Sequence, residues 1–73
     1  MRFYEYNGYT IYPVPQLIVG SSYWMIELII KSKDILKIFS NDNFFRTEGE
    51  AVIHSLAYGK QLIDNGVVSL NQA

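Results

Sequence analysis

The segment from Thr47 to Gly66 is the feature of this chain that most constrains its fold, because it carries helix signals at both ends. Thr47 and Glu50, three residues apart, form a capping box in which each side chain pairs with a free backbone N–H at the helix start. Gly66, which follows Asn65, supplies the left-handed residue that ends many helices. We therefore predict one long helix between these two signals.

The predicted helix is amphipathic. Its apolar stripe, at helical spacing, consists of Val52, Leu56, Gly59 and Ile63, with Ile53 and Leu62 on the flanks. The opposite, polar face carries Glu50, His54, Gln61 and Asp64. A single helix cannot bury such a stripe by itself, so we expect the strands that precede it to cover the stripe. Within the stripe, we interpret Gly59 as a site where the helix and the sheet approach closely. The alternative is that Gly59 is a tolerated weak point of the helix, costing ~1 kcal/mol relative to alanine.

Two aromatic-rich runs at the start of the chain, 2–6 and 9–14, flank the dipeptide Asn7-Gly8. This dipeptide predicts a β-hairpin, because a type I′ turn needs positive φ at both central residues. The two-residue loop then sets the pairs that we expect to face inward: Tyr6 with Tyr9, and Tyr4 with Ile11. The opposite face is also apolar enough to be the buried one, since it carries Phe3, Tyr12 and Val14.

Residues 23–31 form the clearest predicted strand, since four apolar side chains alternate in it without a polar break: Trp24, Ile26, Leu28 and Ile30. These side chains should face the helix. A second strand, 34–40, follows, and the length of the turn before it decides its inner face. A three-residue turn, 32–34, points Lys37 to water, whereas a turn of even length buries it. Because burying an unpaired lysine is costly, we predict the three-residue turn, which places Leu36 and Ile38 inside.

Loop signals separate these strands. Pro13 and Pro15 should end the second strand, since neither can donate to a ladder. The apolar residues 17–19 either pack against the fold or extend a strand. Residues 41–43, Asn-Asp-Asn, predict a turn, after which two phenylalanines should pack under the start of the helix.

Together these elements predict an α+β fold of the order ββββα, an antiparallel four-stranded sheet with one C-terminal amphipathic helix packed on one face. At 73 residues we expect one small domain spanning residues 1–73. Residues 67–70 are apolar enough to dock on it, whether or not they form a strand, and residues 71–73 should fray. An apolar content of 49% favours this folded domain over disorder.

No segment of the sequence has the pattern of a membrane span or a signal peptide. The longest apolar stretch, 23–30, is interrupted by Glu27 and is too short to cross a bilayer. Residues 1–5 lack the basic-then-apolar layout of a signal peptide. We therefore expect a cytoplasmic protein without a membrane partner.

Four segments carry a resemblance: Tyr6 to Ile11, the strand around Trp24, Thr47 to Ala51, and Gly59 to Asp64. In these segments the chain resembles a group of small bacterial proteins of unknown function. The resemblance covers most of the chain and implies a curved antiparallel sheet with one long C-terminal helix. Its motifs are a turn, a cap and a helix–sheet contact, so it implies no catalytic residue. The order of strands and helix is also similar, as fold analogy alone, to small antitoxin domains of the HicB type and to half of a double-stranded-RNA-binding fold.

The sequence contains no set of residues typical of catalysis or of a bound cofactor. It has no cysteine, and therefore neither a thiol nucleophile nor a thiolate metal site. Glu50 could orient the single histidine, His54, as a general base, but without a second histidine a solvated pair is the simpler interpretation. Neither Asn7-Gly8 nor residues 20–22 open a helix as a phosphate-binding loop does. We predict a protein that is not an enzyme and needs no cofactor or metal.

The outer face of the predicted sheet, which is turned away from the helix, is the strongest candidate for function. In the predicted register it carries four neighbouring apolar side chains: Met25, Ile29, Ile35 and Phe39. One helix cannot cover both faces of a sheet, and grouped apolar residues on a small domain indicate an interface. We therefore predict a protein-interaction module, either a homodimer through this face or a complex with another protein.

Nucleic-acid binding through a tyrosine-rich sheet is the alternative, with RNA or single-stranded DNA as the partner. Aromatic rings on strands can stack on bases, and lysines can contact phosphates. The candidate residues are Tyr4, Tyr6, Tyr9, Tyr12, Tyr23, Lys31, Lys33 and Lys37. A net charge of −1 disfavours this alternative, because phosphate neutralisation dominates such binding.

Overall fold

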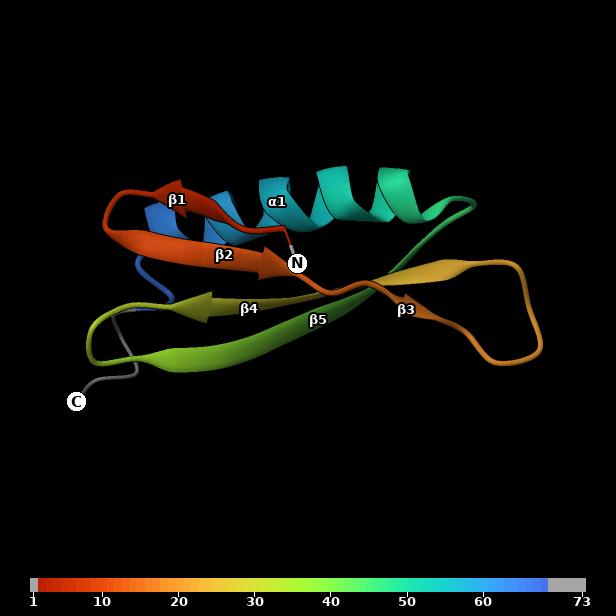
Figure 1. Cartoon of the computed structure of the whole chain (residues 1–73), viewed down its shortest axis with the longest axis horizontal. Coiled ribbons are helices and arrows are strands. Elements are labelled where there is room, and N and C mark those ends of the chain that lie inside the picture. Colours follow the sequence, from red (N-terminus) through yellow and green to blue (C-terminus); the bar gives the residue numbers. More distant parts are fainter. Residues whose placement is uncertain (1, 69–73) are drawn as a thin grey trace.

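A computed structural model describes residues 2–68 and shows an antiparallel sheet with one helix along one face (Figure 1). The strands are β1 (Tyr4–Tyr6), β2 (Tyr9–Pro13), β3 (Gln16–Leu17), β4 (Trp24–Lys31) and β5 (Leu36–Phe45), and the helix is α1 (Glu48–Asp64). The predicted α+β fold with a C-terminal helix is thus confirmed. The sheet has five strands rather than the four predicted, because residues 16–17 form the short β3.

The hairpin of β1 and β2 closes at the predicted turn. Asn7 and Gly8 have φ values of 50° and 84°, the positive values that a type I′ turn requires. The predicted pairs are present: Tyr6 with Tyr9, and Tyr4 with Ile11. Ile11 is fully buried whereas Phe3 is 55% exposed, so the face that we expected to point inward is the buried one.

β2 and β3 pair with the same edge of β4 in one continuous register, from Thr10 opposite Lys31 to Leu17 opposite Trp24. Between them, the Val14 backbone N–H donates to the Glu27 carbonyl at 2.8 Å. The residue that follows is a proline, which has no N–H to donate, so the ladder is interrupted there. The order across the sheet is β1, then β2 with β3, then β4, then β5.

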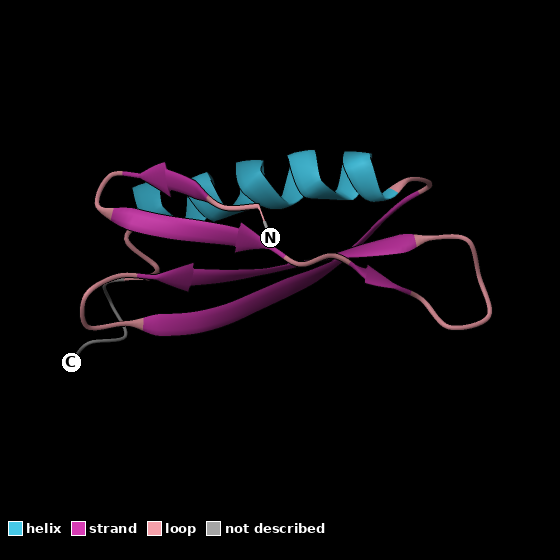
Figure 2. Cartoon of the chain, viewed as in Figure 1, coloured by secondary structure: helices cyan, strands magenta, loops and turns pink. Residues whose placement is uncertain are grey.

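The loop between β3 and β4 extends past the start of α1 (Figure 2). Its turn closes through the Ser21 N–H, which donates to the Ile18 carbonyl at 3.1 Å. Gly20 has a φ of 82°, the positive value that the third position of a type II turn needs. Val19 at the tip is 97% exposed, so of the apolar residues 17–19 it is Leu17 that extends a strand.

The turn between β4 and β5 differs from the predicted one, and the difference changes the inner face of β5. The observed pairs are Lys31 with Leu36, Ile30 with Lys37, and Ile29 with Ile38. The Ser32 N–H donates to the Ile35 carbonyl at 2.8 Å around the dipeptide Lys33-Asp34, so the turn has even length. The predicted three-residue turn is therefore wrong. Leu36 and Ile38, which we expected inside, are 62% and 64% exposed, and Ile35 is buried.

The position of Lys37 explains why the even turn is tolerated. Lys37 lies on the helix side of the sheet, opposite Ile30, but it is half-buried rather than enclosed. β5 is an edge strand, and α1 packs chiefly against β4 and β2. At such a margin the aliphatic stem of a lysine covers apolar surface while its ammonium group reaches water. The desolvation cost that favoured the three-residue turn is thereby avoided.

β5 also continues through residues 41–43, where we predicted a turn. Beyond them Phe44 pairs with Met25, and Phe45 pairs with Trp24. Between the pairs Glu27–Ser40 and Met25–Phe44, β5 has three residues where β4 has one, so the register shifts there. Within these three residues the Asn43 N–H donates to the Asn41 side-chain oxygen at 3.0 Å. The asparagine-rich segment therefore makes an irregularity within one long strand instead of ending it.

The ends of α1 agree with the prediction, whereas its buried face agrees only in part, at Gly59 and Leu62. Thr47 is the N-cap, and its hydroxyl oxygen accepts from the Glu50 N–H at 3.1 Å. Gly66 has a φ of 74° just after the helix. The buried residues are Ala51, Ser55, Gly59 and Leu62, and Ile53 is 65% exposed. The apolar stripe is thus rotated, with three small residues at the centre of the contact and Val52, Leu56 and Ile63 half-buried at its margins.

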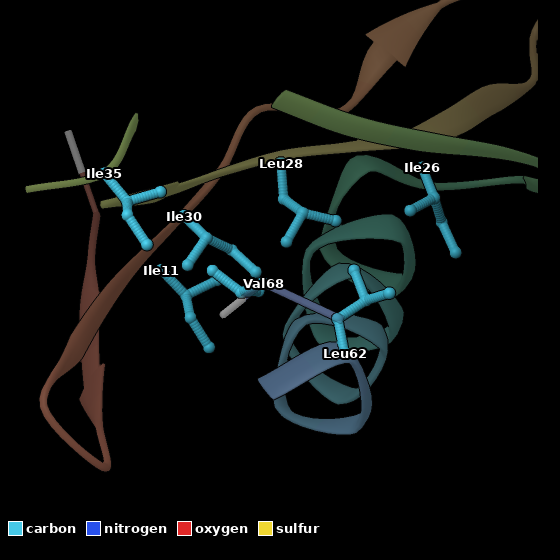
Figure 3. Close-up of a cluster of buried hydrophobic side chains, with 7 residues drawn as sticks. All are labelled: Ile11, Ile26, Leu28, Ile30, Ile35, Leu62 and Val68. Carbon is cyan, nitrogen blue, oxygen red and sulfur yellow. The ribbon is translucent and has the colours of Figure 1, made fainter. Parts of the chain in front are cut away.

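The core lies between the sheet and α1, and it also receives a residue from the turn after the helix (Figure 3). Its buried apolar members are Ile11, Ile26, Leu28, Ile30, Ile35, Leu62 and Val68. The inner row predicted for β4 is confirmed, with Trp24 half-buried at its end. Val67 and Val68 form a turn and Val68 is fully buried, so this segment docks without being a strand. The predictions for residues 69–73 lie outside the described residues.

Candidate interaction surface

One face of the sheet is turned away from α1 (Figure 1). The strand register places on this outer face a row of apolar side chains that crosses the strands. Tyr12 of β2 lies opposite Ile29 of β4, which in turn lies opposite Ile38 of β5. The Phe3 ring continues the row, with its centroid 5.8 Å from that of Tyr12. Side chains alternate along a strand, and the neighbouring Ile11, Leu28 and Ile30 are buried under the helix. The side chains of the row therefore point away from the helix. We call Phe3, Tyr12, Ile29 and Ile38 the outer apolar row.

Three more apolar side chains extend this surface. Leu36 lies opposite Lys31, and Phe44 lies opposite Met25, which like Ile29 is an outward position of β4. The large side chains that are at least half exposed on this face are Phe3, Leu36, Ile38 and Phe44. A cluster of this kind on one face is typical of interaction sites rather than of scattered surface residues.

Charged and polar side chains border the outer apolar row on both sides along β4. Glu27 precedes Ile29 by two residues and lies opposite Ser40 of β5. Lys31 follows Ile29 by two residues, between Thr10 and Leu36. The row is therefore bracketed by one acidic and one basic side chain at equal spacing.

The predicted interface residues separate into two groups. Met25 and Ile29 lie on the outer face, as expected. Ile35 is buried in the core and Phe39, opposite Leu28, packs against the core, so placing these two on the outer face was wrong. The physical reason is the even-length turn, which exchanges the two faces of β5 and brings Leu36 and Ile38 outside. The sequence carries no signal that separates the two turn lengths, because the four consecutive polar residues 31–34 suit either of them.

The structure does not bring the predicted nucleic-acid residues to one surface. Tyr4, Tyr6 and Tyr9 belong to the helix side of the first hairpin, whereas Tyr12 is on the outer face. Tyr23 precedes β4, beside Ser22 and Arg46. The three lysines also separate, since Lys31 points outward, Lys33 lies in the turn and Lys37 lies on the helix side.

A polar contact that sequence reasoning did not anticipate joins the first hairpin to the end of α1. The Tyr6 hydroxyl donates to both carboxylate oxygens of Asp64, at 2.8 and 2.9 Å, and the Asn7 side-chain amide lies 3.5 Å from the same carboxylate. The Lys60 ammonium stands 5.5 Å from the centre of the Tyr6 ring. The hydrogen bond to Asp64, followed by partial desolvation and the Asp64 charge, raises the pKa of Tyr6 above its ordinary value of 10.0. The partners are 58 positions apart in the sequence, so no local pattern indicates this contact.

His54 lines a groove of about 370 Å³ beside β5, together with Asn41, Asn43 and Tyr58. Its ring stacks on Phe45, with centroids 4.3 Å apart and planes 12° from parallel. The Glu50 carboxylate, which we considered as a partner of His54, instead accepts from the Thr47 hydroxyl at 3.3 Å. Among residues 2–68 no three His, Cys, Asp or Glu side chains gather in a way that could hold a metal ion. The arrangement supports a packing role for His54.

Comparisons with known proteins do not extend these observations. No family model, curated protein or solved structure matched the chain. The resemblance to small bacterial proteins of unknown function therefore stays a prediction. Within the described part of the chain, no helix has the length and apolar character needed to cross a membrane.

Proposed function

We propose that this chain is a small non-catalytic protein-interaction module, which buries the outer face of its sheet against a second copy of itself. The observation that carries the proposal is the outer apolar row, Phe3, Tyr12, Ile29 and Ile38, which no element of residues 2–68 covers. We also propose a cytoplasmic location, which suits a chain that has no cysteine and so forms no disulfide.

The size of the surface supports the proposal. The five strands have 3, 5, 2, 8 and 10 residues. At about 3.3 Å per residue and about 4.8 Å between strands they make a face of about 440 Å² before side-chain relief is counted. Two such faces, with side-chain relief added, come close to the roughly 1,000 Å² of total buried surface expected of a specific interface. Each large apolar side chain buried there contributes about 1.5–3 kcal/mol before the costs of association are subtracted.

A second copy is a suitable occupant because the face is self-complementary in character. A two-fold dimer brings the same patch of both subunits together, so an apolar row is placed against an identical apolar row. The product is a four-layer arrangement of helix, sheet, sheet and helix, with both sheets covered on both faces. A domain of 73 residues gains more from such burial than a larger one does, because its own core is small.

The test is the molar mass in solution, measured by light scattering over a range of concentrations. We expect the wild-type protein to approach twice the monomer mass as its concentration rises, and Ile38→Glu to remain a monomer. Ile53→Glu is the matched control, because Ile38 and Ile53 are 64% and 65% exposed, respectively, on opposite sides of the molecule. A wild-type protein that stays monomeric at every concentration, or an equal effect of the two substitutions, would contradict the proposal.

A further inference from the structure

We infer that the second copy packs antiparallel to the first, about a two-fold axis that runs along the outer apolar row, so that Glu27 of each copy meets Lys31 of the other. This inference rests on the proposed function, because it describes how the same face is occupied. Its basis is the position of two opposite charges on β4, at equal distances on either side of Ile29.

The geometry of β4 fixes what a second copy would meet. Glu27, Ile29 and Lys31 are at alternate positions of one strand, and the residues between them, Leu28 and Ile30, are fully buried beneath α1. All three side chains therefore point outward on the same face. The Cα atoms of Glu27 and Lys31 are about 13 Å apart along an extended strand, so side chains that stand perpendicular to the sheet do not pair within one chain.

Two orientations of a symmetric face-to-face dimer must be compared. If the two-fold axis runs parallel to β4, Glu27 stands over Glu27 of the partner subunit and Lys31 over Lys31 of the partner subunit. If the axis runs across the strands through Ile29, β4 reverses direction and each Glu27 stands over a Lys31. Like charges brought together at an interface are costly, whereas opposite charges fix the register of the two chains. The charges of β4 therefore select the axis across the strands.

The neighbours of the two charges are consistent with this orientation. The axis along the outer apolar row places that row on itself, so Ile29 meets Ile29 of the partner subunit. In that arrangement Thr10, which lies beside Lys31, comes over Val14 of the partner subunit, which lies beside its Glu27. Each Glu27–Lys31 pair thus has apolar groups next to it, and partial exclusion of water strengthens an ion pair relative to a fully exposed one.

Charge reversal tests the inference. Glu27→Lys leaves two lysines on β4, and Lys31→Glu leaves two glutamates, so each variant should repel its own kind. We expect the dissociation constant of each variant alone to rise about tenfold or more, and an equimolar mixture of the two to form a heterodimer of near wild-type affinity. The double variant Glu27→Lys/Lys31→Glu restores both pairs and should self-associate like the wild type. Lys60→Glu, on the helix side, is the control for the change in net charge that Lys31→Glu makes.

Mixing the wild type with the double variant separates the two orientations. With the axis across the strands, this mixed dimer places glutamate on glutamate and lysine on lysine, so we expect native mass spectrometry to detect homodimers and little heterodimer. With the axis along β4, every charge in the same mixed dimer meets an opposite one, and the heterodimer would dominate. A dominant heterodimer, or dimers indifferent to all of the reversals, would overturn the inference and leave the proposed function standing. A monomeric wild type would instead overturn the proposed function itself.

Discussion

Gly59 of α1 lies against Leu28 of β4 so closely that a Cβ atom on Gly59 would stand 2.9 Å from the Leu28 Cδ1 atom. Two carbons of Ile11, at 3.1 and 3.2 Å, close the same space. Leu28 and Ile11 are both fully buried, so neither can move without disturbing the core. The missing side chain of Gly59 therefore sets the distance between the helix and the sheet, as the sequence predicted.

Gly59→Ala should accordingly destabilise the protein, although the same change in an exposed helix stabilises it by about 1 kcal/mol. We expect a net loss of roughly 1–3 kcal/mol in the free energy of unfolding, the usual cost of overpacking a core, measured by denaturant titration. Gly49→Ala is the control, because, apart from its chain neighbours and the nearby backbone of α1, no atom lies within 4 Å of a Cβ at that position in the first turn of the helix. Equal effects of the two substitutions would show that helix and sheet are not in close contact at Gly59.

Thr47→Ala should remove the N-cap of α1. The Thr47 hydroxyl oxygen accepts from the Glu50 N–H at 3.1 Å, and without it that donor loses its partner within the chain. We expect a loss of about 0.5–2 kcal/mol in the free energy of unfolding. The measurement is thermal unfolding, monitored by far-UV circular dichroism. Thr47→Ser keeps a hydroxyl at the cap and should retain most of the stability. If alanine and serine behaved alike, the hydroxyl would not be the capping group.

The contact between Tyr6 and Asp64 should make stability depend on pH in the alkaline range. The hydrogen bond to Asp64 raises the pKa of Tyr6 in the folded protein above 10.0, so the folded state holds this proton more tightly than the unfolded chain does. The stabilisation is therefore fully present below pH 10.0 and is lost as the pH rises through the higher pKa of the folded state. We expect Tyr6→Phe to be less stable than the wild type at neutral pH and the difference to shrink in alkali.

Denaturant titrations at neutral and alkaline pH measure this difference. Tyr4→Phe is the control, because Tyr4 is on the same short strand and is 40% exposed. This control shows what the loss of a tyrosine hydroxyl on β1 does apart from the contact with Asp64. A Tyr6→Phe difference that stays constant through the alkaline range would show that the hydroxyl does not donate to Asp64 in solution.

The features that could be predicted from the sequence are those that neighbouring residues decide among themselves. The turn at Asn7-Gly8 depends on two residues that tolerate positive φ, and the start of α1 depends on the hydroxyl of Thr47. The inner face of β4 follows from simple alternation. Each of these signals holds wherever the segment lies in the fold, so no knowledge of the tertiary structure was needed.

The features that were predicted wrongly depend on where an element lies in the finished fold. The cost of burying Lys37 applies at the centre of a sheet, whereas β5 is an edge strand beside which a lysine can reach water. The apolar stripe of the helix marks its most hydrophobic line, whereas contact with the sheet is made where side chains are smallest, at Ala51, Ser55 and Gly59. The candidate interaction surface inherited the first error, which is why Leu36 and Ile38 were missed.

Substitutions at the adjacent residues Ile35 and Leu36 test the register of the β4–β5 hairpin, on which the outer apolar row depends. Ile35 is 8% exposed within the core cluster, and Leu36 is 62% exposed on the outer face. Ile35→Ala should leave a cavity and cost about 2–5 kcal/mol in the free energy of unfolding. Leu36→Ala should change it by no more than about 0.5 kcal/mol, because an exposed side chain loses few contacts. Both are measured by denaturant titration at high dilution, where the proposed dimer is dissociated. The three-residue turn would give the reverse order, with Leu36→Ala the costly substitution, so the comparison decides which face of β5 is available to a partner.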